Sequence, residues 1–224
     1  MLPAVLVLGG RGDIGSAIAD RFAAAGHQVL IVGRAEFDLT DPASIDAWFA
    51  RQRPPIGVLV HSAGLNHPKR FADLTDAEIR ECFAANVEGF LQVARWVIPE
   101  LVAEQGRIVV LSSIFGFLSR TGRLPYAMSK HALVGVVKTL ALELAEEGVL
   151  VNAVSPGYID TSLTRAYNDE ATIARLTSAV PMRRLGTPED VAEVVYFLGS
   201  TDNRYVTGQD VVVDGGFSID GGRG

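Results

Sequence analysis

A tyrosine and a lysine stand four positions apart, at Tyr126 and Lys130, in a stretch whose pattern predicts a long helix. Side chains at i and i+4 of a helix lie over one another, so the phenol and the ammonium would share one face. A nearby cation favours the phenolate and lowers the pKa of a tyrosine, which is usually about 10. Such a pair can act as acid and base near neutral pH. The alternative is that the two side chains meet by chance on a solvated helix surface.

A hydroxyl can reach the same place. Ser113 stands thirteen positions before Tyr126, just after an apolar stretch that predicts a buried strand over residues 107–111. Asn86 lies inside the preceding predicted helix, where asparagine is a mediocre helix former because its amide competes for backbone groups. Its position alone does not separate a solvated amide from a functional one.

A glycine-rich turn follows the first predicted strand. Residues 4–8 form a continuous apolar run, typical of a strand buried in a parallel sheet, and a helix and a second strand at residues 28–32 follow the turn. Glycines in such a turn let backbone N–H groups approach a pyrophosphate at the helix N-terminus. We therefore expect a dinucleotide to be bound by Gly9, Arg11, Gly12, Asp13, Ile14 and Gly15.

The residues after the second strand predict which dinucleotide is used. An acid there would bind the ribose 2′-hydroxyl, whereas an arginine would pair with a 2′-phosphate. Arg34 is the nearest charged side chain, and Arg11 in the glycine turn adds a second cation. This favours NADP(H) over NAD(H). In the alternative, Arg34 is a surface charge and Glu36 or Asp38 binds the ribose.

Three further stretches are expected to meet the cofactor, two of them at carboxyl ends of predicted strands, where a cofactor would cross the sheet. Residues 37–39 predict a very short strand with an acid placed to meet the adenine. Small residues follow a strand at 56–60, and a Pro-Gly turn follows a strand at 149–154. His61, at the same edge, is either a structural hydrogen-bonding group or a base. The expected cofactor contacts here are Asp38, Leu39, Ser62, Ala63, Gly64, Pro156, Gly157, Ile159 and Thr161.

Strands alternate with helices along the whole chain, and no repeat or linker divides it. The pattern predicts one α/β domain over residues 1–224, a Rossmann-type, doubly wound parallel sheet with helices on both faces. Residues 162–185 are polar and weakly periodic, which suggests a lid over a substrate, and the tail from Gly215 is rich in glycine. The seven expected strands cover residues 4–8, 28–32, 37–39, 56–60, 107–111, 149–154 and 209–213.

Composition narrows the class of protein. Apolar residues make up 48% and charged residues 21%, which is typical of a soluble globular domain. A net charge of -6 without any basic run argues against a nucleic-acid partner. The single cysteine, Cys82, and the histidines lack metal-ligand spacing, so we expect an inert buried thiol and no metal site. No stretch predicts a membrane span or a cleaved leader, which suggests a cytoplasmic protein without a membrane partner.

Taken together, the motifs resemble the short-chain dehydrogenase/reductase family over essentially the whole chain. The matching segments are the turn ending in Asp13-Ile14-Gly15, the Ser-Ala-Gly at 62–64, Asn86-Val-Glu-Gly, Ser113, Tyr126-Ala-Met-Ser-Lys130, and Pro156-Gly157 with Thr161. The phrases NAVSPGYIDT, RRLGTPEDVA and YVTGQDVVVDGG look most like the 3-oxoacyl-acyl-carrier-protein reductases. They recur widely in the family and identify the fold better than the substrate.

The resemblance implies a role for four residues. Tyr126 is the acid that protonates a carbonyl oxygen, or the base in the alcohol direction. Lys130 lowers the pKa of Tyr126 and binds the nicotinamide ribose. Ser113 orients and polarises the carbonyl, and Asn86 holds a water that links Lys130 to solvent. The resemblance also implies a homotetramer, and apolar residues on several faces of the helices near Asn86 and Tyr126 fit burial between subunits.

The sequence departs from the family pattern at three places. Leu8 stands for the usual threonine before the first glycine, and Asp13 stands for the usual middle glycine. His61-Ser62 replaces two asparagines, which puts individual cofactor contacts in doubt. The segment from Arg34 to Asp38 is so short that a helix and a turn usual in the family are missing, which would open the adenine end to solvent.

The leading hypothesis is an NADP(H)-dependent carbonyl reductase or alcohol dehydrogenase, with a 3-oxoacyl thioester as one candidate substrate. Its partner could then be an acyl carrier protein or a CoA thioester, guided by arginines that are otherwise ordinary surface charges. Two alternatives stay open: an enzyme for another small ketone or alcohol such as a sugar, polyol or cyclic ketone, and a non-catalytic dinucleotide-binding sensor or scaffold. The arginines in question are Arg120, Arg123, Arg165, Arg183 and Arg184.

Overall fold

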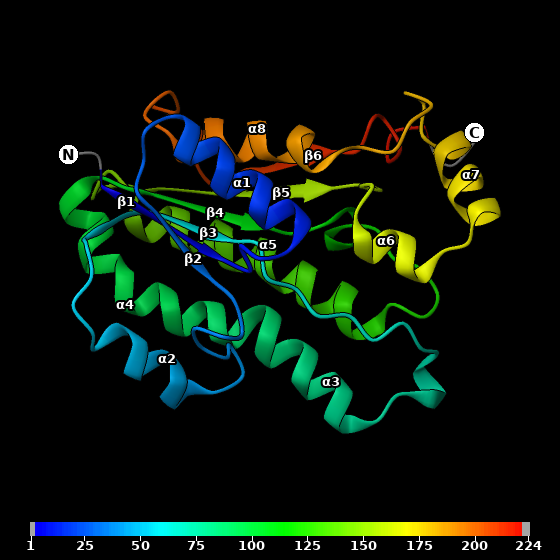
Figure 1. The fold of residues 1–224 in the computed structure, drawn as a ribbon, viewed down its shortest axis with the longest axis horizontal. Coiled ribbons are helices and arrows are strands. Elements are labelled where there is room, and N and C mark those ends of the chain that lie inside the picture. The colour runs from blue at the N-terminus through cyan, green and yellow to red at the C-terminus, as the bar shows by residue number, and fades with distance from the viewer. Residues whose placement is uncertain (1–2, 221–224) are drawn as a thin grey trace.

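The computed structural model describes residues 3–220, so the outermost residues of the predicted 1–224 domain and the last four of its glycine-rich tail lie outside the described part. The chain forms one α/β domain around a parallel sheet (Figure 1). Its strand order is β2-β1-β3-β4-β5-β6, which reverses direction at β1. The strands are β1 (Ala4–Leu8), β2 (Val29–Val32), β3 (Ile56–His61), β4 (Arg107–Leu111), β5 (Leu150–Pro156) and β6 (Asp210–Val213).

Helices cover both faces of the sheet, as expected (Figure 1). Helices α1 and α8 pack on one face with Phe22, Ile18 and Val195 in the core, and α4 and α5 pack on the other with Phe90 and Leu133. The central strands are buried on both faces, which explains their continuous apolar sequence. The helices are α1 (Asp13–Ala24), α2 (Pro42–Phe49), α3 (Asp76–Phe83), α4 (Gly89–Glu104), α5 (Leu124–Leu144), α6 (Ser162–Tyr167), α7 (Glu170–Ala179) and α8 (Pro188–Gly199).

The strand expected at residues 37–39 does not form, so the prediction of seven strands was wrong; residues 3–220 contain six. Only residues 33–36 separate that stretch from β2, whereas a parallel neighbour needs a crossover of a dozen or more residues. The chain turns instead: the N–H groups of Glu36 and Phe37 both donate to the Gly33 carbonyl. The Asp38 carboxylate then accepts from the Thr40 N–H at 2.8 Å. Strand β2 is therefore an edge of the sheet.

Side chains cap the starts of three helices. Thr75 and Glu78 form a capping box at the start of α3, Thr187 and Asp190 form another at α8, and Asp41 caps α2. The helix that begins at Asp76 is not continuous. A π-helical turn at Ala84–Glu88 separates α3 from α4, and such turns are frequent at functional sites.

The stretch at 162–185 is more regular than its weak periodicity suggested, because α6 and α7 occupy most of it. Thr161 and Asp169 cap these two short helices. Figure 1 shows both beside the ends of β5 and α5, at the edge of the sheet where the carboxyl ends of the strands lie. Within residues 3–220, no helix combines the length and the hydrophobicity needed to cross a membrane.

Candidate active site

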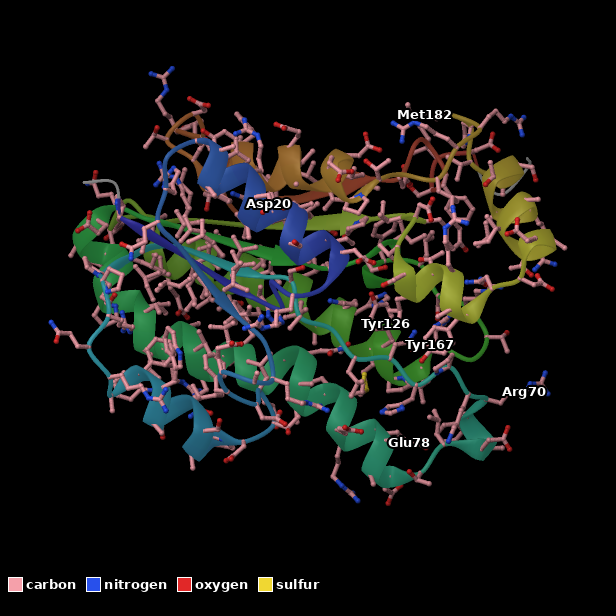
Figure 2. The ribbon with its side chains drawn as sticks, viewed as in Figure 1. Asp20, Arg70, Glu78, Tyr126, Tyr167 and Met182 are labelled. Atoms are coloured by element: carbon pink, nitrogen blue, oxygen red, sulfur yellow. The ribbon has the colours of Figure 1, made fainter. Side chains whose placement is uncertain are left out.

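Ser113 and Tyr126 meet beyond the carboxyl end of β4. Ser113 caps a short 3₁₀ turn, where its Oγ accepts from the Phe115 N–H at 3.2 Å, and Tyr126 lies in the first turn of α5 (Figure 2). Burial raises the pKa of the Tyr126 phenol, while a hydrogen bond with Ser113 and the charge of Arg123 act in the opposite direction. Ser113 and Tyr126, which are thirteen positions apart in the sequence, therefore have their hydroxyls together in the structure.

Lys130 lies one turn further along α5, on the same face as Tyr126, with its Nζ 5.5 Å from the centre of the phenol ring. The ammonium is almost fully buried and donates to the Leu111 carbonyl at 2.6 Å. Burial lowers the pKa of Lys130 to about 8. A second cation, Arg123, also lies near the phenol, and its charge partly offsets the rise that burial causes in the pKa of Tyr126.

Asn86 is fully buried in the π-helical turn and ties three elements together. Its Oδ1 accepts from the Leu65 N–H at 2.6 Å, and its Nδ2 donates to the Leu65 carbonyl and to Ser129 Oγ, both at 2.9 Å. Ser129 Oγ in turn donates to the Tyr126 carbonyl at 2.8 Å. Asn86 is thus not solvated: it fixes the loop after β3 to the first turn of α5.

His61 holds the backbone of the same asparagine. Its Nε2 donates to the Asn86 carbonyl at 2.9 Å, and its ring stacks on Phe90 with centroids 4.9 Å apart. Complete burial and the nearby Lys130 charge lower the pKa of His61 to about 3. The imidazole is neutral at physiological pH, and its Nδ1 has no partner among the described residues. A structural hydrogen-bonding role therefore fits better than a base.

The glycine turn after β1 fits a dinucleotide pyrophosphate. Gly9 has a φ of 75°, and a β-carbon on it would lie 2.6 Å from the Ala63 backbone. A β-carbon on Gly12 would meet only the Gly9 carbonyl, at 3.5 Å, so the space above Gly12 is open. Helix α1 begins at Asp13 without a side-chain cap, which leaves its first N–H groups for an anion.

Asp13 links this turn to α6. Its Oδ2 accepts from the N–H and the hydroxyl of Ser162, at 2.6 and 2.7 Å. Because Ser162 directly follows Thr161, this contact spans the gap between two of the predicted cofactor-binding segments. The sequence showed the substitution at Asp13 but gave no sign of its partner.

Both arginines expected at the adenosine ribose have carboxylate partners. Arg11 pairs with Glu36, whose Oε2 also accepts from the Gly33 N–H at 2.7 Å. These hydrogen bonds lower the pKa of Glu36 to about 2. Arg34 Nε lies 3.4 Å from Asp38 Oδ2 in an exposed pair. Exposed pairs of this kind contribute little free energy, so Arg34 is free to turn toward another anion.

The other predicted cofactor residues lie at the same edge of the sheet. Ser62 donates its N–H to the Leu8 carbonyl, and a β-carbon on Gly64 would stand 3.6 Å from Lys130 Nζ. Gly157 follows β5 and packs against Asp214, whereas Thr161 caps α6. Ile14 lies in the first turn of α1, and Gly15 packs on the glycine turn. Pro156 ends β5, Ile159 is buried, and Leu39 packs against the start of α4.

A hollow of about 460 Å³ beside the glycine turn is a poor candidate for the catalytic centre. Four of its lining residues are acids, and its one arginine, Arg165, is paired with Asp160 at 2.6 Å. Ser113, Tyr126 and Lys130 do not line this hollow, so we locate the centre at Tyr126 by side-chain geometry. No cluster of three potential metal ligands occurs in the described part of the chain.

Sequence reasoning missed Arg123 as a neighbour of Tyr126. Arg123 is half-buried and is the N-cap residue of α5. It stands three positions before Tyr126, and this helical spacing could have identified it as a neighbour of the phenol. The assembled groups are a half-buried phenol with a hydroxyl partner, a buried ammonium and a glycine turn that fits a pyrophosphate. They can hold a carbonyl oxygen and move one proton to or from it.

Comparisons with known proteins agree with this geometry. A family model described as enoyl-(acyl carrier protein) reductase matches residues 32–218. The chain is 35% identical to the 3-oxoacyl-[acyl-carrier-protein] reductase MabA of Mycobacterium tuberculosis, over 96% of this chain and 92% of MabA. Ligand-free aldohexose dehydrogenase of Thermoplasma acidophilum superposes with a TM-score of 0.87 and 32% identity, covering 97% and 94% of the two chains. ElxO with NADP bound gives a TM-score of 0.86 at 27% identity, covering 98% of this chain and all of ElxO.

The chain belongs to the short-chain dehydrogenase/reductase family. It is an oxidoreductase with a nicotinamide dinucleotide as its cofactor, and the alternative of a non-catalytic sensor or scaffold is not retained.

Proposed function

We propose that this protein interconverts a ketone and a secondary alcohol with NADP(H). The observation that carries the proposal is the pairing of the Ser113 and Tyr126 hydroxyls beside the buried Lys130, at the sheet edge that also holds the glycine turn. A nicotinamide dinucleotide bound along this edge supplies or accepts a hydride.

The chain's own residues supply the proton and the orientation. Ser113 donates a hydrogen bond to the carbonyl oxygen, and Tyr126 gives that oxygen a proton during reduction. Because burial raises the pKa of Tyr126, the phenol carries its proton at neutral pH, as an acid must. Asn86 and His61 fix the backbone around this centre. Lys130 lies beside Gly64, where it can bind the ribose of the nicotinamide.

Arg34 supports the choice of NADP(H). It is exposed at the end of β2, its only carboxylate partner in the described residues is Asp38, and it can reorient toward a 2′-phosphate. The NADP-bound ElxO structure has the same fold. Glu36 is the group that opposes this choice, since it is an anion at the same strand end.

The substrate proposal is a small carbonyl compound, with a 3-oxoacyl thioester as the first candidate because MabA is named for that reaction. A sugar or another ketone is the second, because a dehydrogenase of aldohexoses has the same fold. A panel of 3-oxoacyl thioesters, sugars and cyclic ketones, assayed with NADPH and NADH, tests both. Turnover of none of them by the folded protein would refute the proposed function.

The homotetramer also stays a proposal. Helices α4 and α5, which cover one face of the sheet, expose large apolar side chains. These are Trp96 of α4 and Met128 and Leu142 of α5. Leu142 is 82% exposed. Burial of these side chains against a second copy would remove them from water.

We further propose that residues 162–185 act as a lid, held to the glycine turn through Asp13.

A further inference from the structure

A second hollow, of about 570 Å³, lies next to the start of α5 and differs in character from the acid-lined one. Two chain segments form it: residues 69–71, and the loop at 119–124 that leads into the helix of Tyr126. Its lining combines cations with two apolar side chains and contains no acid. The lining residues are Lys69, Arg70, Phe71, Ser119, Arg120, Thr121, Gly122 and Leu124.

The loop at 120–123 is a tight turn that brings two arginines together. The Arg123 N–H donates to the Arg120 carbonyl, and Gly122 has a φ of 77°, as the third residue of a type II turn requires. The Cα atoms of Arg120 and Arg123 are therefore within about 7 Å of each other. A β-carbon on Gly122 would stand 3.6 Å from the Lys69 carbonyl, so the turn also lies against the segment that bears Arg70.

These arginines have no counter-ion within residues 3–220. Lys69 is paired with Glu78 at 2.5 Å, but Arg70, Arg120 and Arg123 form no ion pair and no side-chain hydrogen bond there. Arg123 is half-buried, and both its burial and the charge of Arg120 lower the pKa of its guanidinium. Two like charges placed side by side in this way favour an anion between them.

The reacting phenol is close to this pair. Arg123 stands at the N-cap of α5, one helical turn before Tyr126, and the phenols of Tyr126, Tyr158 and Tyr167 are near enough to oppose the lowering of its pKa. Figure 2 shows Tyr126 and Tyr167 facing the same region, between α5 and α6. Arg120 lines the hollow, and Arg123, which does not, stands between it and Tyr126 along the chain.

We propose that the substrate is an oxo acid, whose carboxylate is bound by Arg120 and Arg123 while its carbonyl oxygen faces Ser113 and Tyr126. The planar guanidinium matches a carboxylate in bidentate geometry. Phe71 and Leu124, both exposed, would cover the hydrocarbon part of the molecule. The phosphate of a CoA or carrier thioester is the other source of an anion, but the pantetheine arm places it far from the reacting carbonyl. This inference rests on the proposed function and names its substrate class.

Matched substrate pairs test the inference on the full chain with NADPH. The first pair is an oxo acid and its methyl ester of the same carbon skeleton, from a series with the ketone two to four carbons from the carboxyl. We expect kcat/KM to be at least about 10-fold higher for the best acid than for its ester, since charge-assisted hydrogen bonds contribute more than neutral ones. Equal values across the series would overturn the inference.

Arginine variants locate the effect. Arg123→Gln and Arg120→Gln should each lower the ratio of kcat/KM for the acid to kcat/KM for the ester by about 10- to 100-fold. Arg123→Lys should recover part of the loss, because it restores the charge without the bidentate geometry. Arg95→Gln, an exposed arginine on α4 outside the hollow, is the matched control and should change neither. Equal losses for acid and ester would indicate a structural role and contradict the inference.

A second substrate pair distinguishes the source of the anion. A 3-oxoacyl-CoA and the corresponding N-acetylcysteamine thioester differ in the phosphates but not in the reacting group. If the arginine variants affected only the CoA thioester, and the acid had no advantage over its ester, the oxo acid proposal would be wrong.

Calorimetric titration separates this inference from the proposed function. The oxo acid is titrated into the protein with NADP⁺ present, and no turnover is needed. Binding that Arg123→Gln weakens about 10-fold or more would support the inference even if no carbonyl were reduced. Equal binding of acid and ester would overturn it even if some neutral ketone were a good substrate.

Discussion

At the scale of single residues, the charge balance around Tyr126 is the feature that sets its chemistry. Burial raises the pKa of the phenol, and the groups that oppose burial are Ser113 and Arg123. The Lys130 ammonium donates a hydrogen bond to the Leu111 carbonyl. Burial lowers the pKa of Lys130 to about 8, so the ammonium gives up its proton more readily than an exposed lysine does. The site therefore has a protonated acid at neutral pH and a cation on each side of it along α5.

His61 predicts a pH dependence of stability. Its folded pKa of about 3 is below the value of about 6.5 for an unfolded histidine, so between these values the unfolded chain binds a proton that the folded chain does not. The free energy of unfolding should therefore fall as pH decreases from about 6.5 toward 3, by up to about 1.4 kcal/mol per pH unit from this group. Urea titrations at several pH values measure it.

The His61→Asn variant isolates that contribution, because other groups also titrate in acid. We expect the variant to lose less stability than the original chain between pH 6.5 and 4. His131→Asn, an exposed histidine on α5, controls for the loss of one imidazole. Parallel pH curves for the His61→Asn variant and the original chain would mean that His61 is not held neutral in the folded state.

The coenzyme preference is decided by two side chains of opposite charge at the end of β2. Arg34→Ala should lower the ratio of kcat/KM with NADPH to that with NADH by about 10-fold or more, because a charge-assisted hydrogen bond to the 2′-phosphate is lost. Glu36→Gln should raise the same ratio, because it removes the anion next to Arg11. Steady-state kinetics with both coenzymes give the ratios. An unchanged ratio in Arg34→Ala would remove the basis for NADP(H).

At the scale of elements, the contact between α1 and α6 joins the cofactor cradle to the proposed lid. Asp13→Ala removes both acceptor bonds to Ser162, whereas Ser162→Ala leaves the backbone N–H as a donor. Amide hydrogen exchange of residues 159–170 should therefore be faster in both variants, and more so in Asp13→Ala. Asp20→Ala removes an acid from the same helix and the same hollow without a hydrogen bond, and it should leave the exchange unchanged.

Local rules of sequence predicted several elements well, because their causes lie within a few residues. The glycine turn at Gly9 and the helix that carries Tyr126 and Lys130 are examples. The prediction of a strand at residues 37–39 was wrong because it rested on a short local pattern. That pattern does not include the crossover length that a parallel neighbour needs. The π-helical turn around Asn86 could not be predicted, since it depends on His61 and Ser129 from distant segments.

The same distinction holds within the site. Tyr126 and Lys130 could be paired from the helical repeat alone, but the direction of the Lys130 ammonium depends on the Leu111 carbonyl of a neighbouring strand. Arg11 and Arg34 were identified as cations, while their carboxylate partners follow from how the chain turns after β2.

At the scale of the whole molecule, the proposed tetramer predicts that a charge placed at its interface lowers the mass of the protein in solution. Leu142→Glu places a charge on the exposed apolar face of α5 and should dissociate an interface there, because burying an unpaired charge is costly. Light scattering should show the mass of the original chain to be about four times that of one chain, and the mass of the variant to be smaller. Ile219→Glu, at another exposed apolar residue, is a matched control for the added charge. A mass near 23.9 kDa for the original chain would contradict the tetramer.

The most direct test of the catalytic proposal is the reductase activity of Tyr126→Phe, measured with whichever ketone the original chain reduces fastest. Fluorescence titration should show NADPH binding within about twofold of the original chain, since the ring and its packing against Phe115 remain. Tyr205→Phe, which removes a hydroxyl at a 96% exposed position, is the control. We predict that kcat falls by at least about 100-fold in Tyr126→Phe, because the proton donor is gone. A kcat within a few-fold of the original chain would contradict the assignment of Tyr126 as the acid.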